Sequence, residues 1–79
     1  MEKKSANQYI LAVDHGTSGI KTSLMSIHGK TVANDFISTP IFIRDGGTAE
    51  QDPEDWWKAL LGTCKNLVDQ NLVPREDIL

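Results

Sequence analysis

The sequence of 79 residues predicts an α/β fold in which a three-stranded antiparallel meander is followed by one long helix. Three observations predict this class. Residues 9–13 form an unbroken apolar run of strand length, and two further segments of strand character follow it after short turns. Residues 52–55 then have the composition of a helix start, and apolar residues recur behind them at helical spacing.

The N-terminal part of the chain predicts a flexible leader followed by a buried strand. Residues 1–8 are polar and show no periodicity, so we expect the folded part to comprise residues 9–79. The unbroken apolar character of residues 9–13 is typical of a strand covered on both faces. This strand is predicted to stop at Asp14, where the apolar run ends.

Two more strands are predicted at residues 20–27 and 31–38, where apolar residues occur among polar ones after short turns. The sequence His28-Gly29-Lys30 between them is typical of a hairpin turn, so the strands are expected to pair antiparallel. Beyond a proline, residues 41–43 are predicted to add a short edge strand. Residues 44–51 contain two adjacent glycines and are predicted to form a loop.

The predicted helix begins after Asp52, which is a favoured N-cap residue, with Pro53 in the first helical position and two acids behind it. Gly62 is expected to weaken this helix, and Pro74 marks the latest point by which it has ended. We expect one apolar stripe to face the sheet. Its predicted members are Trp56, Leu60, Cys64, Leu67 and Val68, widened by Trp57 and Leu61.

Composition excludes several functional classes. The chain is 39% hydrophobic and 24% charged, which is typical of a folded domain, and its net charge of −3 with scattered cations argues against a nucleic-acid partner. No apolar run approaches the roughly 20 residues of a membrane helix, so we expect no membrane partner. A single cysteine, Cys64, fits a reducing compartment. We therefore expect a cytoplasmic protein.

The candidate site is the segment from Asp14 to Gly19, which follows the first predicted strand. Gly16 and Gly19 are expected to permit unusual backbone conformations and a close approach of the main chain to a ligand. Successive N–H groups in such a turn form an anion-binding concavity, and the hydroxyl groups of Thr17 and Ser18 add donors. These features favour a phosphate ligand.

Two charged side chains complete the candidate site. The carboxylate of Asp14 supplies the hard oxygen that magnesium prefers, either directly or through a bound water. Lys21, on the strand after the turn, would place a positive charge toward the phosphates. The segment matches neither the Walker P-loop nor the dinucleotide-binding glycine pattern, because no helix is predicted directly after the first strand.

Simpler explanations compete with a functional one at each of these positions. Asp, Gly and Ser are the commonest turn residues, so the segment from Asp14 to Gly19 could be no more than a turn. His15 and His28 lack neighbours at metal-ligand spacing and are interpreted as surface turn residues. Trp56 and Trp57 are interpreted as a core anchor and a partly exposed neighbour, rather than a platform for sugar stacking.

Two segments together resemble the FGGY family of carbohydrate kinases. Residues 9–21 look like the family's opening strand and first phosphate loop, and residues 49–57 look like its E-x-D-P-x-x-W helix start, at the expected interval. The form E-Q-D-P-E-D-W-W is more similar to xylulose kinases than to glycerol kinase. His15 departs from the family pattern at a position that varies among relatives.

The resemblance implies a fold and a set of roles. The fold is ribonuclease H-like, as in the actin, hexokinase and Hsp70 ATPase superfamily, with two domains that enclose ATP and a sugar or polyol substrate. Asp14 would assist the magnesium ion, and Lys21 stands where the family has Lys or Arg. The residues that would face the ATP phosphates are Gly16, Thr17 and Ser18.

The resemblance also implies that this chain holds only the meander and first helix of the first domain. The family's general base belongs to the second domain, so we expect no catalytic residue here and no activity from the chain alone. Ile78 and Leu79 are expected to begin a further strand. An incomplete sheet would favour self-association of the chain, and the full-length enzyme could form a homodimer. The alternative functions are an actin- or chaperone-like ATPase module and a non-enzymatic interaction domain.

Overall fold

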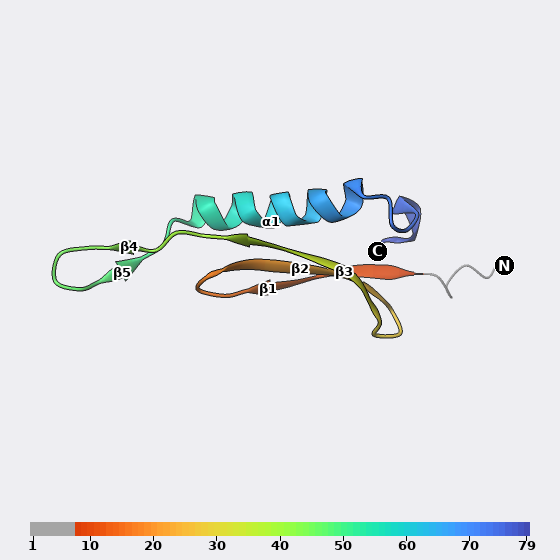
Figure 1. The fold of residues 1–79 in the computed structure, drawn as a ribbon, viewed down its shortest axis with the longest axis horizontal. Coiled ribbons are helices and arrows are strands. Elements are labelled where there is room, and N and C mark those ends of the chain that lie inside the picture. The colour runs from red at the N-terminus through yellow and green to blue at the C-terminus, as the bar shows by residue number, and fades with distance from the viewer. Residues whose placement is uncertain (1–7) are drawn as a thin grey trace.

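The computed structural model describes residues 8–79 and shows one helix that runs along one face of a three-stranded antiparallel sheet (Figure 1). The strands are β1 (Tyr9–His15), β2 (Gly19–Ser26) and β3 (Thr31–Ser38), in the spatial order β1-β2-β3. This arrangement confirms the predicted meander. Of the predicted leader, all but Gln8 lies outside the described residues.

The turn between β2 and β3 forms where the sequence predicts it. Gly29 has a φ of 90°, a left-handed conformation that glycine adopts without a steric penalty. The N–H of Gly29 donates to the carbonyl of Ser26 at 2.9 Å, and the N–H of Ser26 donates to the carbonyl of Lys30 at 2.8 Å. The strands then pair antiparallel, with a register shift between Leu24 and Met25.

Two predictions about β1 are wrong. The strand does not stop at Asp14, because Asp14 and His15 continue the ladder by pairing with Lys21 and Ile20 of β2. Backbone pairing, rather than the apolar run, sets its end. The strand is also not covered on both faces among the described residues. The helix lies over β2 and β3, which leaves Val13 47% exposed.

Helix α1 (Pro53–Asp69) begins as the sequence predicts. Asp52 is the N-cap, and its Oδ1 accepts a hydrogen bond from the N–H of Glu54 at 3.0 Å. Pro53 occupies the first turn, where its missing N–H costs no hydrogen bond. The helix ends at the C-cap Gln70, before Pro74. These contacts are local, which explains why the sequence alone predicts them.

The face that α1 buries differs from the predicted apolar stripe. Its fully buried residues are Ala59, Thr63 and Leu67, spaced four residues apart, and only Leu67 belongs to the predicted stripe. Two of the three, Ala59 and Thr63, are small, which favours close packing of the helix on the sheet. A Cβ atom added at Gly62 would lie only 2.7 Å from Cδ1 of Ile37, so this glycine also serves the close approach.

The larger predicted stripe residues lie at the margins of the buried face. Four of them are half-buried: Trp56, Leu60, Cys64 and Val68. Trp57 and Leu61 are 56% and 51% exposed. The predicted stripe was wrong in its centre because helical periodicity groups residues by their apolar character, whereas the face that packs on the sheet also includes the small Ala59 and the polar Thr63.

The core between the layers contains a buried pair of hydroxyl groups. Ile20 and Leu24 of β2 pack in this layer, and Thr22 and Thr63 are fully buried. The two threonine hydroxyls lie 2.7 Å apart, and the hydroxyl of Thr63 also donates to the carbonyl of Leu60 at 3.0 Å. Each buried hydroxyl therefore has a partner, as folding requires. The sequence offered no signal for this pair, which joins residues 41 positions apart.

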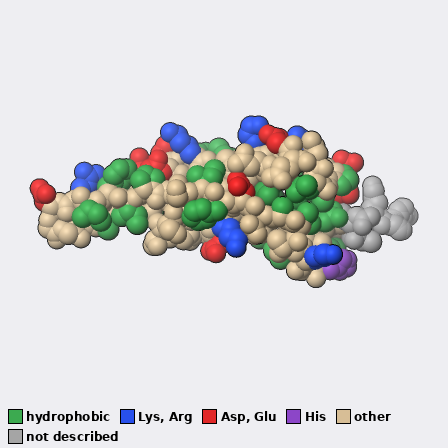
Figure 2. All heavy atoms as spheres, in the orientation of Figure 1, with side chains coloured by type: hydrophobic (Ala, Val, Ile, Leu, Met, Phe, Trp, Pro, Cys, Tyr) green, Lys and Arg blue, Asp and Glu red, His purple; other side chains and the backbone are tan. Residues whose placement is uncertain are grey.

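A second, two-stranded hairpin projects from the end of the sheet near the start of α1 (Figure 1). It consists of β4 (Phe42–Ile43) and β5 (Ala49–Glu50), which pair with each other. The predicted edge strand at 41–43 therefore does not join the main sheet. Figure 2 shows apolar side chains on this hairpin, where Ile43 is 70% exposed.

The C-terminal residues return to the first strand. After the short 3-10 helix η2 (Arg75–Asp77), Ile78 forms a parallel bridge with Tyr9, and the N–H of Leu79 donates to the carbonyl of Tyr9 at 2.8 Å. This bridge agrees with the prediction that a further strand begins at Ile78. Among residues 8–79, no helix has the length and apolar character needed to cross a membrane.

Candidate functional site

The turn between β1 and β2 leaves main-chain donors available to a ligand. The N–H of Gly16 donates to the carbonyl of Gly19 at 2.9 Å and closes the turn. The N–H groups of Thr17 and Ser18 donate no hydrogen bond to any of residues 8–79, and both residues are exposed. Two adjacent N–H groups without a partner are the parts of an anion-binding concavity.

Asp14 lies beside this turn on the face of the sheet that α1 does not cover. Side chains alternate along a strand, so Asp14 points away from the helix while Val13 and His15 point toward it. The cross-strand partner of Asp14 is Lys21, and both are exposed. No ion pair joins the two within the described part of the chain. The carboxylate is therefore accessible at the end of the strand.

The chemistry of this carboxylate fits a magnesium ion that shares its coordination with phosphates and water. Residues 8–79 contain no group of three or more side chains able to hold a metal by themselves. Magnesium is commonly bound by one or two carboxylates together with substrate phosphates and several waters, so a single exposed Asp14 beside free N–H groups is compatible with it.

Of the two glycines of the candidate site, only Gly19 is required by a close approach, and neither has a left-handed backbone conformation. Neither Gly16 nor Gly19 has a positive φ, so the expected use of a left-handed conformation is wrong. A Cβ atom at Gly19 would lie 2.4 Å from the carbonyl oxygen of Ile37, which excludes any other residue without a backbone shift. At Gly16 the nearest atom would be 3.8 Å away, which leaves that side of the turn open.

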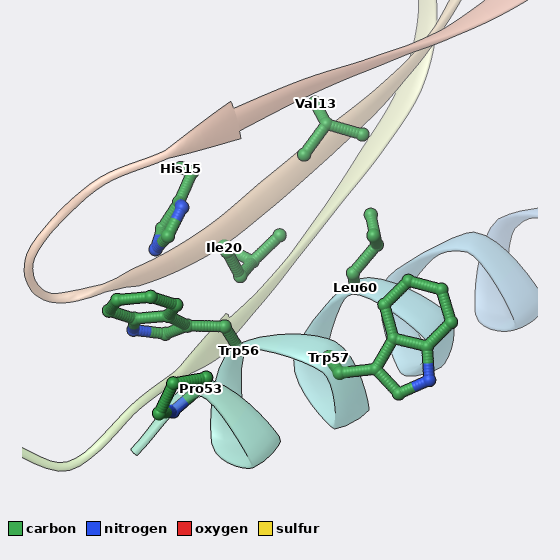
Figure 3. Close-up of a pocket in the computed structure, with 7 residues that line it drawn as sticks. All are labelled: Val13, His15, Ile20, Pro53, Trp56, Trp57 and Leu60. Atoms are coloured by element: carbon green, nitrogen blue, oxygen red, sulfur yellow. The ribbon is translucent and has the colours of Figure 1, made fainter. Parts of the chain in front are cut away.

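His15 belongs to a separate pocket on the helix side of the sheet. Its ring contacts that of Trp56 edge to face, with centroids 4.6 Å apart and an interplanar angle of 67° (Figure 3). The pocket has a volume of about 230 Å³ and includes Val13 and Trp57 in its lining. His15 is thus a strand residue packed on Trp56 and not a turn residue. The pocket and Asp14 lie on opposite faces of the sheet.

The candidate turn has two contacts with residues that follow β3, and sequence reasoning missed both. Gln51 directly precedes the helix N-cap Asp52. Its Nε2 donates to the carbonyl of Thr17 at 2.9 Å and lies 3.3 Å from the hydroxyl of Thr39. The N–H of Thr39 donates to the carbonyl of Ser18 at 3.1 Å. No local pattern signals the first of these contacts, because it joins residues 34 positions apart.

Comparison with known proteins assigns the chain to a family. Residues 9–79 match the family model described as the FGGY family of carbohydrate kinases, N-terminal domain. The chain belongs to this family. The predicted resemblance is therefore confirmed over all but one of the described residues.

Curated relatives of the FGGY family match most of this chain. It is 34% identical over 71 residues to xylulose kinase of Bacillus subtilis (strain 168), which covers 90% of this chain and 14% of that protein. It is 35% identical over 63 residues to gluconokinase of the same organism, covering 80% and 12%. Glycerol kinase of Marinomonas sp. (strain MWYL1) is 35% identical over 60 residues, covering 76% and 12%. These identities do not separate xylulose from glycerol kinases, so that preference stays a prediction.

Solved FGGY structures confirm the fold class. Ligand-bound xylulose kinase from Lactobacillus acidophilus superposes with a TM-score of 0.75 at 32% identity, covering 80% of this chain and 13% of that one. Gluconate kinase from the same organism has a TM-score of 0.75 at 31% identity, covering 81% and 13%. These sugar kinases have the actin-like ATPase fold, as predicted. The chain spans 12 to 14% of the length of the curated relatives described above.

Proposed function

We propose that the protein carrying this chain transfers the γ-phosphoryl group of ATP to a hydroxyl group of a sugar or polyol, such as xylulose or glycerol. The observation that carries the proposal is the turn after β1. It combines an exposed carboxylate with two N–H groups that have no partner among residues 8–79, in a chain of the carbohydrate kinase family. Such a combination suits a metal-bound polyphosphate.

Each residue of the turn would have a separate role in binding the nucleotide. Thr17 and Ser18 would donate their N–H and hydroxyl groups to phosphate oxygens, with Gly16 leaving room for close approach. Lys21 would add a positive charge beside Asp14. Asp14 would hold magnesium directly or through water. When bound, the ion supplies neutralisation of the charge that develops on the transferred phosphoryl group.

The proposal assigns the remaining chemistry to residues outside this chain. We infer that residues 9–79 form the N-terminal part of the first ribonuclease H-like domain, and that the base acting on the sugar hydroxyl lies elsewhere in a longer protein. The coverage of 14% of Bacillus subtilis xylulose kinase supports this division. The chain alone would then be inactive. A cytoplasmic location belongs to the same proposal, since Cys64 is unpaired and ATP is the donor.

The experiment that tests this function follows phosphoryl transfer directly. The full-length protein is incubated with magnesium and ATP labelled in the γ-phosphate, together with xylulose, gluconate or glycerol in separate reactions. We expect label to appear in at least one sugar or polyol, and not in reactions from which magnesium is removed by a chelator. ATP hydrolysis without transfer to any of the three would instead favour an ATPase module. The family match favours the kinase over that alternative and over a non-enzymatic domain.

Self-association is a further part of the proposal. The face of the sheet opposite α1 leaves Ile10, Val32 and Phe36 exposed by 39%, 40% and 51%. An uncovered apolar face beside unpaired strand edges favours association of the isolated chain with itself. Analytical ultracentrifugation of the 79-residue chain should therefore show oligomers at high micromolar concentration. A single monomeric species there would contradict this expectation.

A further inference from the structure

We propose that Gln51 is a positioning residue that orients the Ser18 N–H group toward the phosphates of the nucleotide. The inference rests on the proposed function and adds to it a residue on a different element from the turn. Gln51 lies between β5 and the N-cap of α1, and it is half-buried. It is the only one of residues 8–79 whose side chain donates to the carbonyl of a turn residue at positions 16–18.

The distances identify the two hydrogen bonds of the Gln51 amide. Nε2 lies 2.9 Å from the carbonyl oxygen of Thr17 and 3.3 Å from Oγ1 of Thr39. A third oxygen, the carbonyl of Pro40, is at the limit of hydrogen bonding at 3.5 Å. A side-chain amide nitrogen carries two hydrogens, so the two shorter contacts satisfy it. The shortest contact is the one to the turn.

Because the peptide unit is planar, the hydrogen bond from Gln51 to the Thr17 carbonyl also fixes the direction of the Ser18 N–H. The carbonyl of Thr17 and the N–H of Ser18 belong to one peptide unit, and no cis peptide bond occurs in the described part of the chain. In a planar trans unit these two groups point in opposite directions. A hydrogen bond that holds the Thr17 carbonyl toward Gln51 therefore turns the Ser18 N–H away from it, to the open side of the turn.

A second bond acts on the next peptide unit in the same way. The N–H of Thr39 donates to the carbonyl of Ser18 at 3.1 Å, so two consecutive carbonyls of the turn are held by residues that follow β3. Gln51 itself precedes Asp52, whose cap fixes the start of α1. The hydrogen bond from Gln51 to Thr17, here called the brace, therefore connects the β1–β2 turn to the start of α1. Without the brace, the peptide between Thr17 and Ser18 would be held only by the exposed turn itself.

The test compares two equal substitutions in the full-length protein. Gln51→Met keeps the length of the side chain and removes both donors. Gln70→Met makes the same change at the exposed C-cap of α1, where the side chain makes no hydrogen bond to any described residue. Loss of one oriented donor is expected to raise the KM for ATP about 3- to 10-fold in Gln51→Met. The KM for the sugar should stay within about twofold, and Gln70→Met should resemble the wild type.

Amide hydrogen exchange reports on the hydrogen bonds of the turn without measuring activity. Amide hydrogen exchange at Thr39, whose N–H bonds to the turn, should be faster in Gln51→Met and unchanged in Gln70→Met. The inference fails if Gln51→Met keeps its KM for ATP while Asp14→Ala loses turnover, because the proposed function then stands without the brace. It also fails if both substrate KM values, kcat and the melting temperature change together, which indicates general destabilisation. Unaltered turnover in Asp14→Ala would remove only the metal role proposed for Asp14, whereas phosphoryl transfer to none of the three substrates would remove the proposed function and the inference with it.

Discussion

Replacing Asp14 with alanine is expected to lower the turnover of the full-length protein by about 100-fold or more, with sugar affinity nearly unchanged. The carboxylate is exposed at the end of β1, on the face away from the helix core, so its loss should not disturb packing. Its proposed partner is magnesium, whose charge matters most when the phosphoryl group is transferred. Steady-state kinetics at varied magnesium and sugar concentrations would measure both effects.

Two further variants sharpen this measurement. Asp14→Asn keeps the shape and removes the charge, so it should also lose turnover and require more magnesium for half of its maximal rate. Asp45→Asn makes the same change in the exposed turn of the projecting hairpin and should behave as wild type. Turnover within twofold of wild type in Asp14→Ala would exclude the proposed metal role. An equal loss in Asp45→Asn would point to a nonspecific effect of charge.

The largest expected effect on stability comes from Leu67→Ala. Leu67 is 1% exposed between α1 and the sheet, so truncation leaves a cavity in a small core. Such changes lower the free energy of unfolding by about 3 kcal/mol. In a chain of this size that corresponds to a decrease in melting temperature of roughly 12 °C or more. Thermal unfolding of the 79-residue chain, followed by circular dichroism, would measure it.

Leu61→Ala is the matched control for this change. It makes the same substitution in the same helix, but Leu61 is 51% exposed, so little packing is lost. Its effect on the free energy of unfolding should stay below about 1 kcal/mol. Equal destabilisation by the two variants would show that helix propensity, rather than the cavity, determines the loss, and would contradict the burial of Leu67.

Features governed by neighbouring residues were predictable from the sequence. The turn at Gly29 follows from a conformation that glycine alone adopts freely, and the start of α1 follows from Asp52 and Pro53. The family could be predicted as well, because two motifs occur at the right interval. The turn and the helix start depend on residues within a few positions of one another, and the family assignment depends on the spacing between two such short motifs.

Features that join distant residues were decided by the tertiary structure. The end of β1 depends on pairing with β2, and the buried face of α1 depends on how closely it approaches the sheet. The contact from Gln51 to the turn arises only when segments 34 positions apart meet. The sequence alone thus determined the three-stranded meander, the helix start and the glycine-containing turn between β1 and β2. Only folding decided which face Asp14 occupies and which side chain is hydrogen-bonded to the turn, because strand pairing and layer packing bring those groups together.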